Sequence, residues 1–400
     1  MPYIDALPRD QLVGIGRALD KALKEHRDRV WPCLVQARDA ARHEQVLVPL
    51  SRLSAPQGYS GASVFIAYWR GAGARRASLP LIVKVGDRST LEGERHRAAR
   101  VPPHPGGADA RLARPLSLER VSDKWVLISP FASMTTTNDG GTTYEFRIED
   151  LWKRLHDSAT YDDLEASLSK TYKLIHQMHG DGRTRPRRRG MKYNKQYLPY
   201  LRGIDSSRRT LATSLFGRDR STRMFERSWT NPLRVMDKLL TEGFRGARGP
   251  IHGDLHPKNI VFEDEKDSNP TIIDFGWANA DAHVVADYVL MDVNLRAMTL
   301  ATHVSATAAV QLAEMLDRDA DVPGDEAIEV RARLIKKVLW PQVAPFVVDW
   351  DREYLVPLFL MSLGLLRYLH NARNQTALLA LVLAAGDRID QRLLSGSTRA

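Results

Sequence analysis

Three polar side chains, Asp254, Asn259 and Asp274, stand at spacings that suit metal-dependent phosphoryl transfer. The first two lie in Ile251-His-Gly-Asp-Leu-His-Pro-Lys-Asn-Ile-Val-Phe262, and the third lies in Ile272-Ile-Asp-Phe-Gly-Trp277. Moving a γ-phosphoryl group depends mostly on placing an acceptor hydroxyl and neutralising charge, so the site needs a carboxylate facing the acceptor and oxygen ligands for magnesium. We expect Asp254 to act as the base and Asn259 with Asp274 to bind Mg²⁺.

Two short strands would position these residues. The apolar run 260–262 reads as one strand and 271–273 as its partner, because a polar loop containing Glu, Asp, Lys, Ser, Asn and Pro separates them. Such a hairpin would bring Asp274 beside the loop that carries Asp254.

A second strand pair is expected far upstream. Val46, Val48 and Leu50 recur at a period of two, and residues 64–69 form another apolar run. Between them, Gly58, Ser60 and Gly61 form a turn whose backbone N–H groups and hydroxyl could approach phosphates. Most turns of this kind are ordinary hairpin loops, so its position ahead of the next strand carries the interpretation.

That next strand, residues 79–86, contains a single charged side chain, Lys84. A buried ammonium needs a partner, because burying it unpaired is costly. A helix that begins near Ser89 offers Glu92 and Glu94, which cannot both face Lys84 because they are two residues apart. The alternative is that both glutamates are solvated and that Lys84 reaches solvent from an edge strand.

The two central segments resemble the catalytic-loop and metal-loop signatures of the protein-kinase-like superfamily, His-x-Asp-x-x-x-x-Asn and Asp-Phe-Gly. The catalytic-loop sequence is similar to that of the aminoglycoside phosphotransferase and choline kinase branch, whose motif is His-Gly-Asp-Leu-His-x-x-Asn. His256 occupies the position where eukaryotic-type protein kinases carry a lysine, which disfavours a polypeptide substrate. His-Pro-Lys-Asn, Phe-Gly-Trp and Asp-Tyr-Val-Leu also resemble the bacterial ternary-complex-associated kinase-like domains, which implies a signalling or defence context.

The resemblance implies an α+β fold with two lobes, a small antiparallel-sheet N-lobe and a large, mostly helical C-lobe. It implies that residues 43–131 are the N-lobe and 132–400 the C-lobe. Residues 1–42 are expected to be a helical extension, because Leu12, Ile15, Leu19 and Leu23 share one helical face. Strands four and five are expected at 111–118 and 124–128, with a hinge for the adenine ring at 129–133.

The resemblance also assigns roles. It implies that Lys84 holds the α- and β-phosphates of ATP or GTP and pairs with Glu94, under a cover formed by Gly58, Ser60 and Gly61. His252 would brace the catalytic loop, Asp287 would support its backbone, and Lys258 would neutralise the transferred group in place of the missing lysine.

Between these motifs lie a predicted long helix, with Leu164, Leu168, Tyr172, Ile175 and His179 on one face, and a basic segment. His176 and His179 are better explained as core or helix-end residues than as metal ligands. The basic segment, Arg183–Lys195, is ordinarily a solvated loop, and its alternative role is binding of an anionic ligand or partner. Tyrosines lie between these basic residues, so RNA binding stays an alternative, although nucleic acid is not favoured.

Composition fits a sizeable enzyme. The 400 residues are 43% hydrophobic and 26% charged, and the net charge of +10 suits a polyphosphate as well as nucleic acid. The one cysteine, Cys33, excludes an internal disulfide framework, and the N-terminus has no secretion signal, so we expect a cytoplasmic protein. Charged and polar residues interrupt the apolar region 354–386, so we expect buried helices there and no membrane span.

These observations favour an ATP- or GTP-dependent phosphotransferase that acts on a hydroxyl of a small molecule. Two alternatives stay open: a nucleotide-binding regulatory module, and a kinase of protein or RNA targets. The acceptor cannot be read from the sequence, because acceptor pockets in this fold are assembled from variable helices.

Overall fold

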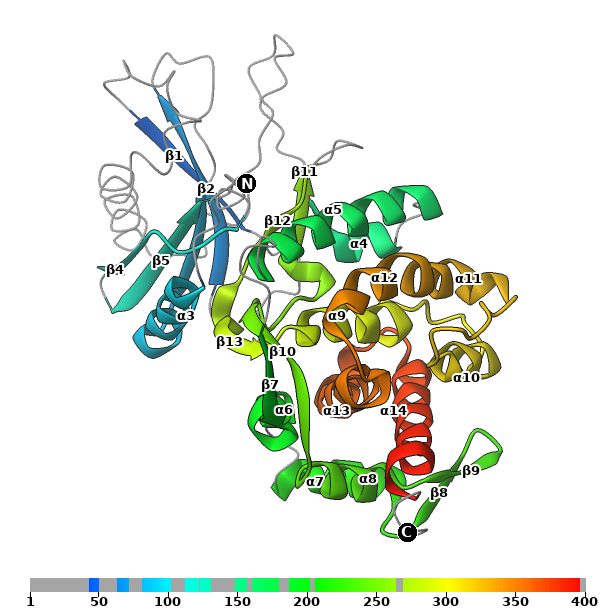
Figure 1. Cartoon of the computed structure of the whole chain (residues 1–400). Helices are drawn as coiled ribbons and strands as arrows, with labels where there is room; N and C mark the ends of the chain where they lie inside the picture. Colours follow the sequence, from blue (N-terminus) through cyan, green and yellow to red (C-terminus); the bar gives the residue numbers. More distant parts are fainter. Residues whose placement is uncertain are drawn as a thin grey trace.

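The computed structural model describes residues 43–49, 63–71, 81–101, 112–121, 123–130, 148–156, 160–179, 187–201, 206–263 and 269–395. Within these residues a small sheet with one helix lies beside a larger helical lobe (Figure 1). The expected N-terminal extension 1–42, the glycine turn with Gly58, Ser60 and Gly61, and the hinge residues 131–133 lie outside the described residues.

The small lobe is built on an antiparallel sheet with the order β1-β2-β3-β5-β4 among the described strands. Alternating and β-branched apolar residues favour these strands, as the sequence indicated. Lys84 on β3 lies opposite Val64 on β2 and Leu127 on β5, so it is in the middle of the sheet. The bounds are β1 His43–Pro49, β2 Ser63–Gly71, β3 Leu81–Gly86, β4 Ser117–Val121 and β5 Lys124–Pro130.

One helix, α3 (Arg88–Arg100), follows β3 directly and packs on this sheet. Leu91 and Glu94 on its buried face are one turn apart, and Leu91 packs against Leu127 of β5. The same helix contacts the turn Phe275–Trp277 and the strand β13 (Asn279–His283) of the large lobe. It therefore joins the two lobes beside the metal loop.

The predicted fourth strand is placed wrongly. The start of the predicted segment does not pair with β5: Leu112 forms a parallel bridge with Ile272, Ala113 N donates to Ile272 O at 2.9 Å, and the first hydrogen bond to β5 is from Leu116 N to Ile128 O. The strand itself, β4, begins at Ser117. The segment before it thus ties the small lobe to the strand that leads into the metal loop.

The large lobe carries two small sheets, ordered β12-β11-β6 and β13-β10-β7, and a separate β8-β9 hairpin. The predicted hairpin is present, since β11 pairs antiparallel with β12 through Ile260–Ile272 and Val261–Thr271. The strands are β6 Ile148–Asp150, β7 Arg187–Lys192, β8 Ser221–Met224, β9 Arg227–Thr230, β10 Gly243–Ile251, β11 Ile260–Glu263, β12 Thr271–Ile272 and β13 Asn279–His283.

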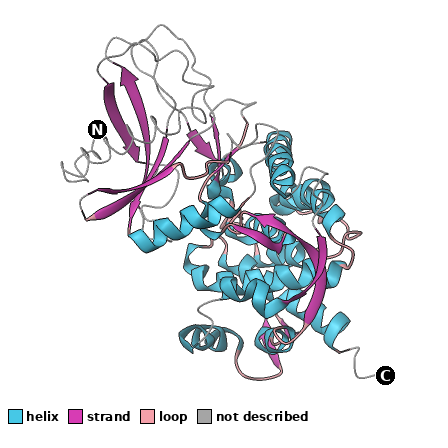
Figure 2. Ribbon diagram, turned by 60° about the vertical axis from the view of Figure 1, so that its left-hand side comes forward, coloured by secondary structure: helices cyan, strands magenta, loops and turns pink. Residues whose placement is uncertain are grey.

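Helices make up the rest of the large lobe. Figure 2 shows them packed against one another, with the short strands of this lobe beside them. The α-helices are α4 Leu151–His156, α5 Tyr161–His179, α6 Tyr193–Leu201, α7 Ser206–Phe216, α8 Pro232–Leu239, α9 Val285–Val293, α10 Ala306–Glu314, α11 Glu326–Arg333, α12 Trp340–Val343, α13 Val356–Leu365 and α14 Gln375–Ile389. Short 3-10 or π-helical segments lie at 257–259, 275–277, 294–298, 334–339, 344–346, 351–355, 366–371 and 390–394.

The core of this lobe centres on α13, which contacts α6, α9 and α14. Every residue from Val356 to Gly364 is buried, so the apolar region near the C-terminus forms interior helices, as expected. Asn374 caps α14 by accepting a hydrogen bond from Ala377 N. None of the helices in the described ranges combines the length and the apolar character that crossing a membrane requires.

Candidate active site

Lys84 lies between two carboxylates at the junction of the lobes. Its Nζ is 2.8 Å from Glu94 Oε1 on α3 and 2.9 Å from Asp274 Oδ1 in the metal loop. Burial alone would lower the pKa of Lys84, but the carboxylates of Asp274 and Glu94 outweigh it and raise that pKa above its ordinary value. The ammonium is therefore permanently charged and points into the space shared by the lobes.

The structure distinguishes the two candidate glutamates. Glu94 is buried against Lys84, whereas Glu92 accepts from Arg88 Nε at 3.1 Å in an exposed pair one turn apart on α3. Helical periodicity accounts for the difference, because residues two apart face different directions. Lys84 and Glu94 thus form the pair, in the middle of the sheet and not at its edge.

The catalytic loop is held from below by Asp287, a fully buried residue on α9. Its carboxylate accepts hydrogen bonds from His252 N at 2.9 Å and Gly253 N at 2.8 Å, and contacts His179 Nε2 at 3.0 Å. His179 ends α5 and is itself buried. It is a buried residue at a helix end that contacts Asp287, as expected for a core or helix-end histidine.

His252 joins the two functional loops. Its Nε2 donates to Ile273 O at 2.9 Å, and its Nδ1 accepts from Asp254 N at 3.3 Å. The ring also packs edge-on against Phe275, with centroids 4.8 Å apart. His252 thereby fixes the residues that precede Asp274 relative to Asp254.

Gly253 allows the catalytic loop to touch the metal loop. Its φ is +82°, and a Cβ added there would lie 2.3 Å from the Trp277 carbonyl oxygen. Glycine adopts this left-handed backbone without a side-chain clash, so the motif requires it at this position. This contact escaped the sequence analysis, although the glycine belongs to the motif.

Asp254 has the electrostatic environment of a base. Burial and the nearby charge of Asp274 raise the pKa of its carboxyl to about 7, while His252, Arg367 and Lys84 act in the opposite direction. A base whose pKa is close to neutrality is well matched to proton abstraction from a hydroxyl. Asp274 differs, because the Lys84 ammonium overcomes burial and lowers its pKa.

Asn259 and Asp274 present oxygen donors. Asn259 Nδ2 donates to Asp254 O at 2.8 Å, which leaves its Oδ1 as the donor atom for a cation. Asp274 adopts φ +64°, and its Oδ1 accepts from Gly276 N at 3.2 Å. One amide and one carboxylate suit Mg²⁺, which commonly completes its shell with phosphate oxygens and water. No cluster of three or more His, Cys, Asp or Glu side chains able to hold a metal occurs in the described part of the chain.

The other two polar residues of the loop have local partners. His256 Nδ1 accepts from Lys258 N at 3.2 Å, and burial lowers the pKa of its ring to about 4, so it is neutral near pH 7. Lys258 Nζ lies 4.5 Å from the centroid of the Trp152 ring on α4.

Tyr200 on α6 is a site residue that the sequence analysis missed. Its hydroxyl donates to Gly253 O at 2.7 Å, and its ring stacks on Trp277 with centroids 5.5 Å apart and planes 25° apart. Trp277 keeps 38% of its surface exposed. The position of Trp277 directly after the Asp-Phe-Gly motif could have indicated that it lies at the site. Nothing in the sequence around Tyr200 indicated a role.

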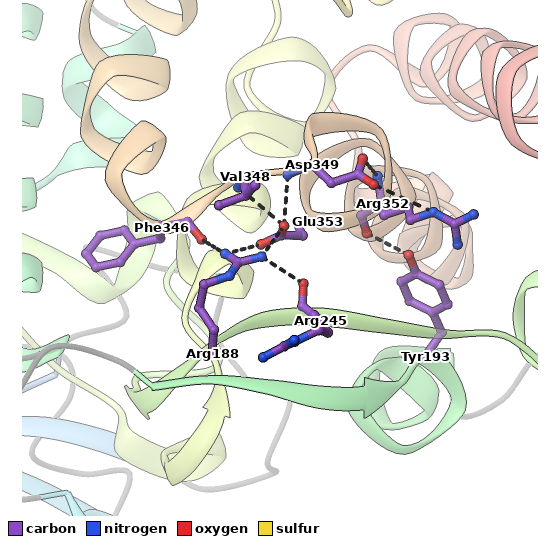
Figure 3. A network of polar contacts seen from close by, with 8 residues as sticks. All are labelled: Arg188, Tyr193, Arg245, Phe346, Val348, Asp349, Arg352 and Glu353. Atoms are coloured by element: carbon purple, nitrogen blue, oxygen red, sulfur yellow. Dashed lines mark hydrogen bonds and ion pairs between the residues drawn. The ribbon is translucent and has the colours of Figure 1, made fainter.

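The basic segment is only partly a solvated loop. Residues 187–192 form strand β7, and the Arg188 guanidinium binds both oxygens of Glu353, at 2.8 and 2.6 Å (Figure 3). The same guanidinium donates to the carbonyls of Phe346 and Arg245, and Glu353 also accepts from Val348 N and Asp349 N. Arg188 is therefore a structural residue, while Arg187, Arg189, Lys192 and Lys195 stay exposed.

Comparisons with known proteins give distant likenesses. A Haemophilus somnus 129PT structure provisionally named a fructosamine-3-kinase has 9% identity and a TM-score of 0.36, covering 88% of this chain and 92% of its own. A Plasmodium vivax ethanolamine kinase has 9% identity and a TM-score of 0.37, covering 89% and 81%. No curated protein matches the sequence.

A family model described as "Ternary complex associated domain 9" matches residues 148–337, which include both functional loops. The geometry is more telling than these likenesses. A five-stranded antiparallel sheet carries a lysine paired with a helix glutamate, and a helical lobe presents a catalytic loop and an Asp-Phe-Gly loop beside it. The chain has a two-lobed, protein-kinase-like fold.

Proposed function

We propose that this chain is a phosphotransferase that moves the γ-phosphoryl group of ATP or GTP to a hydroxyl of a small molecule, with Mg²⁺ as cofactor. The observation that carries the proposal is the position of Lys84 Nζ, within 2.9 Å of both Glu94 and Asp274. A buried ammonium held between a helix glutamate and a metal-loop aspartate is suited to nucleotide phosphates, which the net positive charge also favours.

Each residue has a role in this proposal. Lys84, oriented by Glu94, binds phosphate oxygens, and Gly58, Ser60 and Gly61 cover them. Asp254 orients the acceptor hydroxyl and accepts its proton, and the raised pKa of its carboxyl suits that step. Asn259 and Asp274 would hold magnesium, which neutralises charge on the phosphates when it is bound.

The test is incubation of the purified chain with magnesium and γ-labelled ATP or GTP, with and without cell extract. Label should enter a new small molecule, and Asp254→Ala should abolish transfer while nucleotide binding stays within about two-fold, because Asp254 faces the acceptor and not the nucleotide. Transfer retained by Asp254→Ala would contradict the assignment of the base.

A second candidate is a nucleotide-binding module that acts inside a protein assembly. The family description, which names association in a ternary complex, favours it. This candidate predicts saturable nucleotide binding, lost in Lys84→Met, with no label in small molecules or in macromolecules. Label in a protein or RNA fraction would instead identify a macromolecular acceptor.

A further inference from the structure

Helix α13 approaches the catalytic loop through a contact that only glycine permits. A Cβ added to Gly364 would lie 2.5 Å from the carbonyl oxygen of Tyr200 on α6. The hydroxyl of Tyr200 in turn donates to Gly253 O, one residue before Asp254. The face of the C-terminal helices that includes Gly364 therefore lies one side chain away from the catalytic loop.

Arg367 lies on that same face. It follows Gly364 by three residues, and the chain continues from α13 into a 3-10 turn at Leu366–Asn371, where residues three apart share a face. Its guanidinium is 4.4 Å from the centroid of the Tyr368 ring, which helps to fix its position. Arg367 is half-buried, so its charge is only partly exposed to solvent.

The charge of Arg367 is close enough to lower the pKa of the Asp254 carboxyl, against the larger opposite effects of burial and Asp274. Lys84 acts on Asp254 from the nucleotide side. Arg367 belongs to the C-terminal helices, whereas Lys84 belongs to the small lobe, so the two cations that act on Asp254 come from different lobes.

Trp277 adds an apolar surface beside the catalytic loop. One face of its ring stacks on Tyr200, which is held by both Gly253 and Gly364, and 38% of the residue remains exposed. An exposed, supported indole next to a catalytic loop is suited to contact a ring or other flat apolar group.

We propose that the acceptor of this kinase is a hydroxyl compound that also carries an anionic group, carboxylate or phosphate, which binds Arg367, with its apolar part against Trp277. This inference rests on the proposed function, because it assigns the acceptor side of the same site. Arginine suits the role because its planar guanidinium binds carboxylate and phosphate oxygens in pairs. A cationic acceptor would instead meet a like charge beside the base.

The test uses three probes with the same ring and hydroxyl and different charge: 4-(hydroxymethyl)benzoate, 4-(hydroxymethyl)benzamide and 4-(hydroxymethyl)benzylamine. Calorimetric titration, with and without magnesium and a non-hydrolysable ATP analogue, should rank the anion above the amide and the amide above the amine. We expect the anion to bind about ten-fold more tightly than the amide, as one charge-assisted hydrogen bond can supply. Because no phosphoryl group is transferred, this result is separate from whether the chain is a kinase.

The variants make the assignment specific. Arg367→Ala should remove the preference for the anion and Arg367→Lys should retain part of it, while Arg223→Ala, an exposed arginine on the distant β8-β9 hairpin, should leave it unchanged. Equal binding of the amide or amine, no binding of the benzoate, or a preference that survives Arg367→Ala would overturn the proposal. In a transfer assay with an acceptor from the anionic fraction of cell extract, Arg367→Ala should raise KM much more than it lowers kcat.

Discussion

Gly253 and Trp277 meet backbone to backbone, with the Trp277 carbonyl oxygen occupying the place of a side chain on Gly253. We expect Gly253→Ala to destabilise the fold by about 3 kcal/mol or more and to abolish transfer, because left-handed strain and a backbone clash act together. The control is Gly217→Ala, where φ is +72° and nothing lies within 4 Å of the added Cβ. That variant should lose only about 1 kcal/mol in urea unfolding, and equal losses would refute the role of the Trp277 contact.

The Lys84–Glu94 pair should matter far more than its exposed neighbour on α3. Glu94→Gln removes the charge that orients a buried ammonium, so we expect at least a ten-fold weaker affinity for MgATP and a loss of about 2–3 kcal/mol of stability. Glu92→Gln disrupts only the exposed Arg88 pair and should change stability by less than about 0.5 kcal/mol. Fluorescent-nucleotide titration and thermal melting measure both, and similar effects of the two variants would contradict the assignment.

Titration of Asp254 should lower the free energy of unfolding as the pH rises. The pKa of its carboxyl is about 7 in the folded chain against an ordinary value of 3.8, so the folded state holds its proton more tightly than the unfolded state does. This contribution is fully present below about pH 4 and is lost as the pH rises through 7. Partial exposure of the side chain, 30%, limits its size to about 1–2 kcal/mol.

The unfolding free energy of Asp254→Asn relative to that of the original chain should therefore increase between pH 4 and pH 7. Above pH 7 the difference between the two proteins should stay constant. Denaturant unfolding of the metal-free, nucleotide-free proteins across this range measures the difference. A difference that does not vary with pH would mean that Asp254 titrates normally.

Arg188 and Arg189 are adjacent arginines with different expected effects. Arg188→Ala leaves the carboxylate of Glu353, whose side chain is 1% exposed, without its cation, so we expect a loss of about 2–4 kcal/mol. Arg189→Ala removes an exposed side chain and should stay within about 0.5 kcal/mol. Equal stability of the two variants in urea unfolding would show that the network in Figure 3 contributes little.

Local pattern was sufficient wherever neighbours along the chain set the geometry. The strand of Lys84 and the helix that follows it come from periodicity over a few residues, and periodicity also limits the partner of Lys84 to one of Glu92 and Glu94, whereas the choice of Glu94 came from the family resemblance. The β11-β12 hairpin was predictable for the same reason. Asp254, Asn259 and Asp274 lie within or beside that hairpin, so their proximity could be expected, whereas their catalytic roles stay predictions.

Contacts between distant segments could not be predicted in this way. Tyr200 and Gly253 are 53 residues apart, and Arg188 and Glu353 are 165 apart. The basic segment was read as a loop from its charge, yet β10 provides a pairing partner and Glu353 a counter-charge, and together they allow a strand. Tertiary partners decide such cases, because strand formation depends on neighbours across the sheet.

The position of the loop that carries Asp254 depends on Asp287. Its buried carboxylate fastens the backbone of the reacting segment to α9, deep in the helical lobe, and His179 fastens it to α5. None of the small-lobe residues that the structure describes takes part in this attachment. Partial melting of the small lobe would therefore release Lys84 but leave the backbone around Asp254 in place, whereas loosening of α9 would disrupt that backbone, so the order of the Asp254 loop should follow the cooperative unfolding of the helical lobe.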